Sequence, residues 1–571
     1  MRRLWITTTI LMLGLVSALP GSQNVRAAEG VAGEKLLPKD TLLFFTIPDV
    51  PEMKAQWDKS LMGSMFRDPE LKPFLDDVQK KIDEASGKLQ DEIGVSIADL
   101  LSIPQGEVTF ALMERPTRKL SAVLMLEYGE KKETVDKLLK QMHEALDGDV
   151  AEHITEDIDD VKVHVYTIKN DDPNNPFKTL AYFNDHSYLV FSSEVDALKD
   201  VLARWDGESD DTLANNDVFK YIQDKCKDDA GQPALKWYFN PIALVQSGLN
   251  MAQAVQPQVG MVAPFLPMLG LDKLKGWGGA VYSAAGDFDG ISKAFVYADQ
   301  PSGLLNVFQF PATELAPPKW VSAEASTYNG GNWNVVQAYQ AVESLVDMFQ
   351  GRGALARLLD QAANNDNGPG IHPKKDLLDL LDGKFHMVQG VEAERGEQPV
   401  QHFLLALDVK DAARMKTTLE KIAKSDGSPV EKREFNGETI YEFATPAGDQ
   451  TFSFAVATGH LVATNDTSML EGMLRSARQP SLVESASYRM IAKYFPAKLS
   501  MISFQRSDAQ LKALYDMLKN NDNAEFLDGI DLQKLPPFEV LEKYLRSSGS
   551  YTIPDKKGAL SVGFQLREGD R

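Results

Sequence analysis

Histidine residues are the first place to look for metal chemistry in this chain. The eight histidines form no His-Glu-x-x-His and no His-x-His pattern, so no linear zinc motif is present. His153 stands between Glu152 and Glu156, a spacing that would place both carboxylates on one helical face, but its β-branched neighbours favour a loop or a strand end. We therefore predict no metal ligand from the sequence.

Carboxylates are densest in the stretch that contains His153. Seven lie between Asp147 and Asp160, and calcium prefers clustered oxygen ligands of this kind. The stretch lacks the Asp-x-Asp-x-Asp-Gly order of a calcium loop. We predict a solvated acidic loop rather than a calcium site.

Nucleophiles and phosphate-binding loops give no catalytic motif. Cys226 is the only cysteine, which excludes an intramolecular disulfide, and we interpret it as a buried, inert thiol although Lys225 and Lys227 flank it. No Gly-x-Ser-x-Gly elbow occurs, and Gly330-Gly331 is interpreted as a turn rather than part of a nucleotide loop. Triads assemble in space, so a hydrolase in a cleft between domains stays open as an alternative. We predict no catalytic residue, no cofactor-binding residue and no cofactor.

The net charge restricts the classes of partner that the chain can bind. The chain has 571 residues and a formal charge of −22, without a basic stripe. Such a field repels nucleic acid, and we predict no nucleic-acid partner.

The N-terminus has the pattern of an export signal. Arg2 and Arg3 precede an apolar run over 4–19, and Val25-Arg26-Ala27 places small residues at the positions that signal peptidase reads. The run is shorter than the ~20 residues of a membrane span. We predict a signal peptide over 1-28, cleaved near Ala27 or Ala28, and a periplasmic or extracellular mature chain without a transmembrane span.

Long-range repetition is the strongest signal in the sequence. Asp99-Leu100-Leu101 and Gly106 return as Asp376-Leu377-Leu378 and Gly383, at an offset of 277 residues. Gly290 and Gly558 open equivalent final strands, at an offset of 268 residues. A period this long indicates a duplicated domain, because solenoid repeats are only about 20–50 residues long.

Each half is predicted to alternate strand hairpins with amphipathic helices. The helix over 132–145 and the strands over 161–168, 179–184 and 188–192 illustrate the pattern. We predict an α+β fold with two homologous halves, each a mostly antiparallel sheet packed with amphipathic helices. The domains are a first repeat over 29-309, a proline-rich linker over 310-319 and a second repeat over 320-571.

The chain also resembles a family of uncharacterised, exported bacterial proteins with an internally duplicated domain of unknown function. The resemblance rests on the opening Leu37-Pro38-Lys39-Asp40-Thr41 and on the segments that run from Asp99 to Gly106 and from Asp376 to Gly383. The second half departs at its opening, where Pro318-Lys319-Trp320-Val321 replaces the Asp-Thr pair. The resemblance implies export and duplication, and it supplies no activity.

The segment 240–271 contains no charged residue, and the first charge after it is Asp272. Burial against the other half would explain this, and so would an apolar binding surface, because methionine-rich surfaces adapt to varied ligands. The residues that would form such a surface are Met251, Met261, Phe265, Leu266 and Met268. We predict an exported, non-catalytic binding or envelope-associated protein whose partner is an unknown protein, peptide or apolar ligand. Two alternatives to this prediction stay open. One is the hydrolase, and the other is a periplasmic carrier of apolar ligands that uses this segment.

Overall fold

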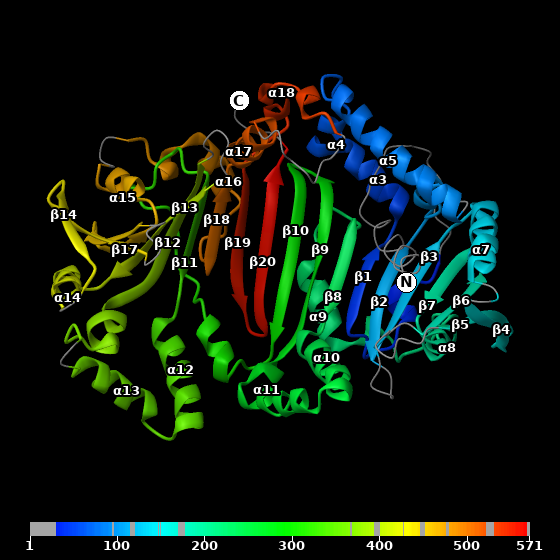
Figure 1. The fold of residues 1–571 in the computed structure, drawn as a ribbon, viewed down its shortest axis with the longest axis horizontal. Coiled ribbons are helices and arrows are strands. Elements are labelled where there is room, and N and C mark those ends of the chain that lie inside the picture. The colour runs from blue at the N-terminus through cyan, green and yellow to red at the C-terminus, as the bar shows by residue number, and fades with distance from the viewer. Residues whose placement is uncertain are drawn as a thin grey trace. The chain divides into compact units, whose positions relative to one another are not determined.

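The protein is described by a computed structural model (Figure 1). The description covers residues 30–567, apart from 94–95, 115–119, 147, 149, 170–177, 366–367, 393–399, 426–427, 446–450, 476–478 and 521–529. The predicted signal peptide lies outside the described residues.

The chain folds as two compact units. Unit 1 comprises the chain up to Ala263 together with Lys275–Tyr297 and Phe526–Val540, and unit 2 comprises Pro264–Leu274, Ala298–Glu525 and the C-terminal part from Leu541. The boundary near Tyr297 precedes the predicted linker 310-319, which belongs to unit 2. Thr313 in that stretch exchanges two backbone hydrogen bonds of 3.0 Å with Leu499. The proline-rich stretch is thus held on unit 2 by backbone hydrogen bonds instead of linking two domains.

Unit 1 contains an antiparallel sheet in the order β4-β5-β6-β7-β3-β2-β1-β8-β9-β10. Its strands are β1 (Leu43–Ile47), β2 (Val108–Glu114), β3 (Leu120–Glu127), β4 (Ala151–Ile158), β5 (Val161–Ile168), β6 (Thr179–Asp185), β7 (Tyr188–Ser192), β8 (Leu235–Phe239), β9 (Leu274–Ala285) and β10 (Phe288–Ala298). Its main helices are α3 (Val50–Lys59), α4 (Leu61–Phe66), α5 (Lys72–Ile93), α6 (Ile97–Ser102), α7 (Lys132–Leu146), α8 (Val195–Leu202), α9 (Asp217–Cys226) and α10 (Pro241–Val255).

Unit 2 contains an antiparallel sheet in the order β14-β15-β16-β17-β13-β12-β11-β18-β19-β20, which is the order of unit 1 with ten added to each strand number. Its strands are β11 (Thr327–Asn332), β12 (Leu381–Glu392), β13 (Val400–Val409), β14 (Glu431–Phe435), β15 (Glu438–Ala444), β16 (Thr451–Ala457), β17 (His460–Thr464), β18 (Met501–Gln505), β19 (Ser548–Asp555) and β20 (Gly558–Leu566). Its main helices are α11 (Phe265–Met268), α12 (Val335–Gln350), α13 (Ala354–Ala363), α14 (Ala412–Lys424), α15 (Thr467–Leu474), α16 (Ala486–Ala492) and α17 (Ser507–Asn520), with short turns η5 (Pro373–Leu377) and η6 (Leu378–Leu380) before β12.

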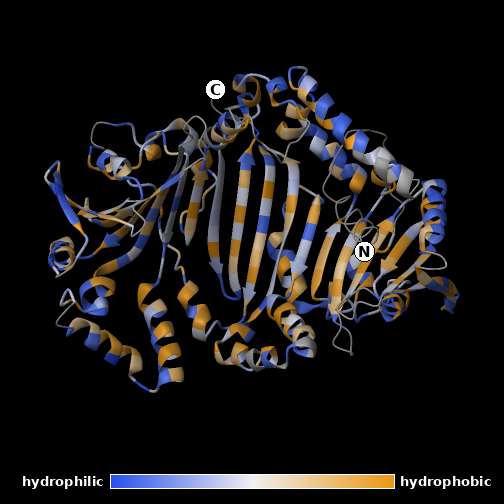
Figure 2. Ribbon diagram, viewed as in Figure 1, coloured by the Kyte–Doolittle hydropathy of each residue, from blue (hydrophilic) through white to orange (hydrophobic). Residues whose placement is uncertain are grey.

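The strands arise from alternation of apolar and polar residues, visible along both sheets in Figure 2. In β3 every second side chain is buried, the pattern of a strand with one face on the core. The predicted strands over 161–168, 179–184 and 188–192 are confirmed as β5, β6 and β7, and the predicted helix over 132–145 is confirmed as α7. The α+β class is therefore correct. Among the described residues, no helix is both long and apolar enough to cross a bilayer.

The prediction of an acidic loop over 147–160 is wrong for most of the stretch. Residues 151–158 form β4, which pairs with β5 from Ala151↔Ile168 to Ile158↔Val161. Within the described sheet, β5 is the only partner of β4, and Glu152 and Asp157 on β4 are exposed. Charged side chains on such an edge strand discourage pairing with another chain. The carboxylates therefore mark a protected edge.

The interpretation of Gly330-Gly331 as a turn is also wrong. Both glycines lie inside β11, opposite His386 and Phe385 of β12. A Cβ on Gly331 would come within 2.5 Å of the Phe385 ring, and a Cβ on Gly330 within 2.5 Å of the Tyr328 hydroxyl. Glycine is required here by close packing within a strand.

Asp99 and Asp376, the repeated aspartates, play matching local roles. The Asp99 carboxylate accepts from the Ser96 backbone N–H (3.4 Å) at the start of α6, and the Asp376 carboxylate accepts from the His372 N–H (2.8 Å) at the start of η5. In each unit the aspartate thus stabilises the first turn of the short helical segment that precedes β2 or β12. Both aspartates accept a hydrogen bond at the start of a short helical segment.

We expect Asp99→Ala and Asp376→Ala each to lower the free energy of unfolding by about 1 kcal/mol, because each leaves an N-terminal backbone N–H without its acceptor. Chemical denaturation of the full chain measures the effect. Asp99→Asn and Asp376→Asn, which keep an acceptor oxygen, are the controls and should recover most of the loss. Equal losses for alanine and asparagine would contradict a capping role.

Three histidines of unit 1 pack into one aromatic cluster under α7. His153 Nε2 lies 3.1 Å from His164 Nδ1, and His143 Nδ1 lies 2.9 Å from the Tyr166 hydroxyl. Burial is the main cause of a lowered pKa at His164, and the charges of His153 and His143 lower this pKa further. The titratable groups around it come from α7, β4, β5 and β6, and they are His143, His153, Lys162, Tyr166 and Tyr182.

We expect the free energy of unfolding to decrease as the pH falls below the ordinary histidine pKa of about 6.5. The folded state resists protonation of His164 while the unfolded state accepts the proton, so acid favours unfolding. His164→Gln should make the dependence shallower between neutral pH and about pH 5, measured by denaturation at several pH values. An unchanged slope would show that His164 does not couple to folding.

Candidate functional site

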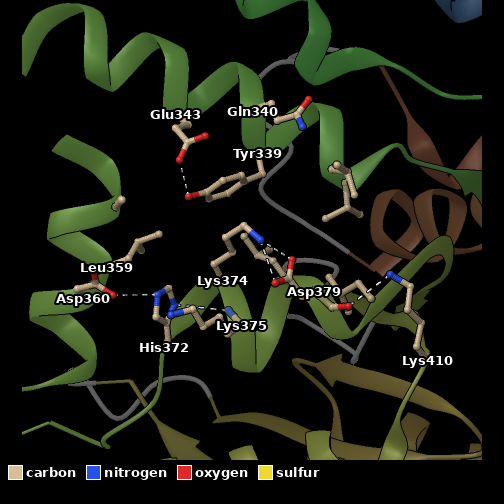
Figure 3. A pocket seen from close by; sticks show the side chains of 15 residues that line it. Tyr339, Gln340, Glu343, Leu359, Asp360, His372, Lys374, Lys375, Asp379 and Lys410 are labelled. Carbon is tan, nitrogen blue, oxygen red and sulfur yellow. Dashed lines mark hydrogen bonds and ion pairs between the residues drawn. The ribbon is translucent and has the colours of Figure 1, made fainter. Parts of the chain in front are cut away.

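A pocket of about 410 Å³ lies in unit 2 (Figure 3). Helices α12 and α13, the turns η5 and η6, and the adjoining ends of β12 and β13 surround it. The lining residues are Val335, Val336, Tyr339, Gln340, Glu343, Ala356, Leu359, Asp360, His372, Lys374, Lys375, Leu378, Asp379, Leu381 and Lys410. Its size lies in the range of small-molecule sites.

The turn between α12 and α13 is held by one carboxylate. Asp347 accepts hydrogen bonds from the backbone N–H groups of Gly353 (2.6 Å) and Leu355 (3.2 Å). The hydrogen bond from Gly353 is the main cause of a lowered pKa at Asp347. Gly353, at φ 74°, occupies the left-handed region that glycine adopts without strain. This turn sets the position of α13 relative to α12.

The floor of the pocket is part of the apolar core of unit 2. Val335 and Leu381 line the pocket and belong to a core cluster with Met415 and Leu419 of α14. Leu378 packs against the same cluster. A ligand in the pocket would therefore rest on a rigid apolar surface.

The wall formed by α12 is acidic. Tyr339 donates its hydroxyl proton to Glu343 Oε1, one helical turn along, at 3.1 Å. Burial, followed by Glu343, raises the pKa of Tyr339 to about 12. Tyr339 is thus a neutral donor at physiological pH, and its hydroxyl is the hydrogen-bond partner of Glu343.

The facing wall carries lysines. Lys374 Nζ lies 2.8 and 2.9 Å from the two Asp379 oxygens and 5.2 Å from the centre of the Tyr339 ring, so its charge is compensated. Lys410 Nζ donates to the Asp379 backbone oxygen at 3.3 Å, and Lys375 is exposed. Within the described part of the chain, neither Lys375 nor Lys410 has a carboxylate within ion-pair distance.

His372 occupies the lower corner of the pocket. Its Nδ1 accepts from the Lys375 backbone N–H at 3.4 Å, and its Nε2 lies 3.4 Å from Asp360 Oδ1. The ring thus fastens η5 to α13. Figure 3 shows this pair below the cavity and Tyr339, Gln340 and Glu343 above it.

The predicted apolar surface does not form this pocket. Met251 lies on α10 of unit 1 and is 41% exposed, whereas Phe265 and Met268 lie on α11 of unit 2 and are 40% and 48% exposed. Leu266 is buried, and the side chain of Met261 lies outside what the structure describes. Burial of the whole segment 240–271 within the chain is therefore wrong for Met251, Phe265 and Met268. Phe265 instead contacts Phe349 of α12, with ring centres 5.9 Å apart.

The pocket residues were missed by sequence reasoning because they follow no motif. The available signal was the cluster Lys374-Lys375-Asp376 beside the repeated Asp-Leu-Leu segment, which has no basic counterpart before Asp99. No family model matches this sequence, and neither does any curated protein.

We expect Phe265→Asp and Met268→Asp to leave the fold intact, with changes in the free energy of unfolding of about 0.5 kcal/mol, because both side chains are substantially exposed. Leu266→Asp, between them, buries an unpaired charge and should cost several kcal/mol. Thermal and chemical unfolding of the three variants gives the comparison. Unfolding by all three would restore the interpretation of the segment as core.

Proposed function

We propose that this chain is an exported, non-catalytic binding protein whose pocket in unit 2 takes a short peptide or amino acid with free termini. The observation that supports the proposal is the separation of charge across the pocket. Glu343 lines the pocket from α12, and Lys375 and Lys410 line it from η5 and from the residue after β13. A zwitterion with an apolar body matches an acidic wall, a basic wall and an apolar floor.

Binding is favoured over catalysis by the way the titratable groups are used. Tyr339 keeps its proton and donates it to Glu343, and His372 is engaged by Lys375 and Asp360. The described lining contains no serine, threonine or cysteine next to a base. A hydrolase that uses a serine, threonine or cysteine nucleophile would need such a pair, and an apolar carrier would not need the charged walls.

Export and duplication are part of the proposal. The basic start, the apolar run and the Val25-Arg26-Ala27 site favour secretion, as does the resemblance to exported proteins of unknown function. Two homologous halves are supported by the shared strand order and by the matched roles of Asp99 and Asp376. The pocket belongs to unit 2 alone, because two of its walls are formed by α13 and by the lysine-rich turn η5 of that unit.

The first experiment compares three ligands that differ only at their ends. We expect dileucine with free termini to bind the full mature chain in isothermal titration calorimetry. N-acetyl-dileucine, which lacks the ammonium, and dileucine amide, which lacks the carboxylate, should each bind about fivefold more weakly, since exposed ion pairs contribute up to about 1 kcal/mol. Equal affinity for the three ligands would contradict recognition of a zwitterion.

Variants of the two walls then assign each end of the ligand. In Glu343→Gln, dileucine and N-acetyl-dileucine should bind equally, because the partner of the ammonium is gone. In the double variant Lys375→Gln/Lys410→Gln, dileucine and its amide should bind equally, because both partners of the carboxylate are gone. Lys421→Gln, an exposed lysine of α14 outside the pocket, is the matched control, and Ala356→Trp should block all three ligands by filling the cavity. Binding that persists in Ala356→Trp would place the site elsewhere.

A further inference from the structure

A second constellation of unit 2 lies outside the pocket, on one face of the sheet. His386 of β12, Asp408 of β13 and His460 of β17 each point a ligand atom at a common centre, and these atoms all lie within 4.8 Å of one another. The strands β12, β13 and β17 are neighbours in the sheet. The cluster is thus built entirely on paired strands, the most rigid part of the unit.

The strand register explains why the three side chains share one face. Asp408 is directly opposite His460 across the β13–β17 pair. His386 is opposite Ala406, which lies two residues before Asp408 and so points to the same side. Tyr328 of β11 is opposite Val388, and therefore shares the face with His386.

The spacing of the three side chains matches that of ligands around one metal ion. His386 Nε2 and His460 Nε2 lie 3.3 and 3.1 Å from the same oxygen, Asp408 Oδ1. That oxygen is buried between the two imidazoles. Ligand atoms about 2.0–2.1 Å from a tetrahedral zinc ion are about 3.3 Å from one another, which is close to the separation seen here.

A hydroxyl group contacts each imidazole ring at Nδ1, the nitrogen that is directed away from Asp408. The Tyr328 hydroxyl lies 2.8 Å from His386 Nδ1, and Thr458 Oγ1 lies 3.2 Å from His460 Nδ1. Tyr328 also donates to the Ala316 carbonyl oxygen at 3.4 Å, so its oxygen is free to accept the Nδ1 proton. This arrangement leaves the Nε2 lone pair directed at the centre, the tautomer that a metal ion requires.

The surroundings suit a bound cation with an open position. Trp320 stands edge-on to both rings, with centres 6.2 Å from His386 and 5.7 Å from His460, and excludes water from that side. The side chains of His386 and His460 are 6% and 12% exposed, while Asp408 at 27% reaches solvent. A fourth ligand, such as water, can enter beside Asp408.

We propose that His386, Asp408 and His460 bind one divalent transition-metal ion of the zinc class, independently of the peptide pocket. Two imidazoles and one carboxylate select such ions over calcium or magnesium, which take oxygen ligands. The corresponding strand positions of unit 1 are Thr109, Glu127 and Tyr188, where Tyr188 donates to Glu127 at 3.2 Å. Unit 1 keeps a carboxylate there and lacks both imidazoles, so the stoichiometry is one ion per chain.

The test titrates Zn²⁺ into the chelator-treated full chain by calorimetry, in enough salt to screen the acidic surface, with Co²⁺ absorbance as a second readout. We expect one Zn²⁺ per chain and a tetrahedral Co²⁺ spectrum. His386→Gln and His460→Gln should each weaken Zn²⁺ binding by about a hundredfold, and Tyr328→Phe by about tenfold because it acts through His386. His402→Gln, a partly buried histidine of the same strand β13 that lies 3.7 Å from Asp466, should bind as the unaltered chain does.

Three outcomes would overturn the proposal. The chain could bind no Zn²⁺, or bind it equally well in the double variant His386→Gln/His460→Gln. Zn²⁺ binding could instead be lost in His153→Gln, which would place the ion in the histidine cluster of unit 1. If a histidine variant fails to fold, the near-isosteric Asp408→Asn decides the question, with a thermal shift on adding Zn²⁺ expected for the unaltered chain and lost in the variant.

Discussion

The register of antiparallel strand pairing is the constraint on which the rest of this molecule depends. Successive side chains of a strand point to opposite faces, so a slip of one residue between β13 and β17 would remove His460 from Asp408 and place it on the other side of the sheet. The same register puts Leu407 and Leu461 on the opposite face, where they pack with the core cluster of α14. Burial of that apolar face secures the pairing, and the polar cluster takes its position from it.

The strand order common to the two units shows how one scaffold carries different polar clusters. In unit 1, Glu107 accepts hydrogen bonds from Thr46 (2.8 Å) and Thr109 (2.6 Å). Burial is the main cause of its raised pKa, which these donors partly offset. In unit 2 the position of Thr109 is taken by His386, and Gly330 replaces Thr46. The backbone frame is kept while the chemistry of the cluster changes from hydroxyl and carboxylate to imidazole and carboxylate.

The pocket of unit 2 depends on helices rather than on the sheet. Its acidic wall is a single helical turn, in which Tyr339 and Glu343 are four residues apart and so lie on one side of α12. Its basic wall comes from η5 and from the residue after β13, which are close because Lys410 donates to Asp379. Asp347 closes the turn that leads into α13, which supplies a third side of the pocket.

The sequence by itself determined the local structure well. Alternation located β5, β6 and β7, helical spacing located α7, and the recurrence of Asp99 as Asp376 identified the capped turns before β2 and β12. These features depend on neighbours within a few residues, whose hydrophobicity and capping chemistry can be read directly. The edge strand β4 was missed because its exposed carboxylates obscure the alternation.

Only the tertiary structure decided which distant residues meet. His386, Asp408 and His460 belong to three strands, and no spacing in the chain shows that β17 pairs with β13 rather than with another strand. Lys410 reaches the pocket because β13 ends beside η6, a consequence of sheet packing. The uncharged segment 240–271 was divided between two units, since the exposure of Phe265 and the burial of Leu266 depend on what packs against α11. Local composition determines what a segment can form, whereas contacts between residues far apart in the chain determine what that segment faces.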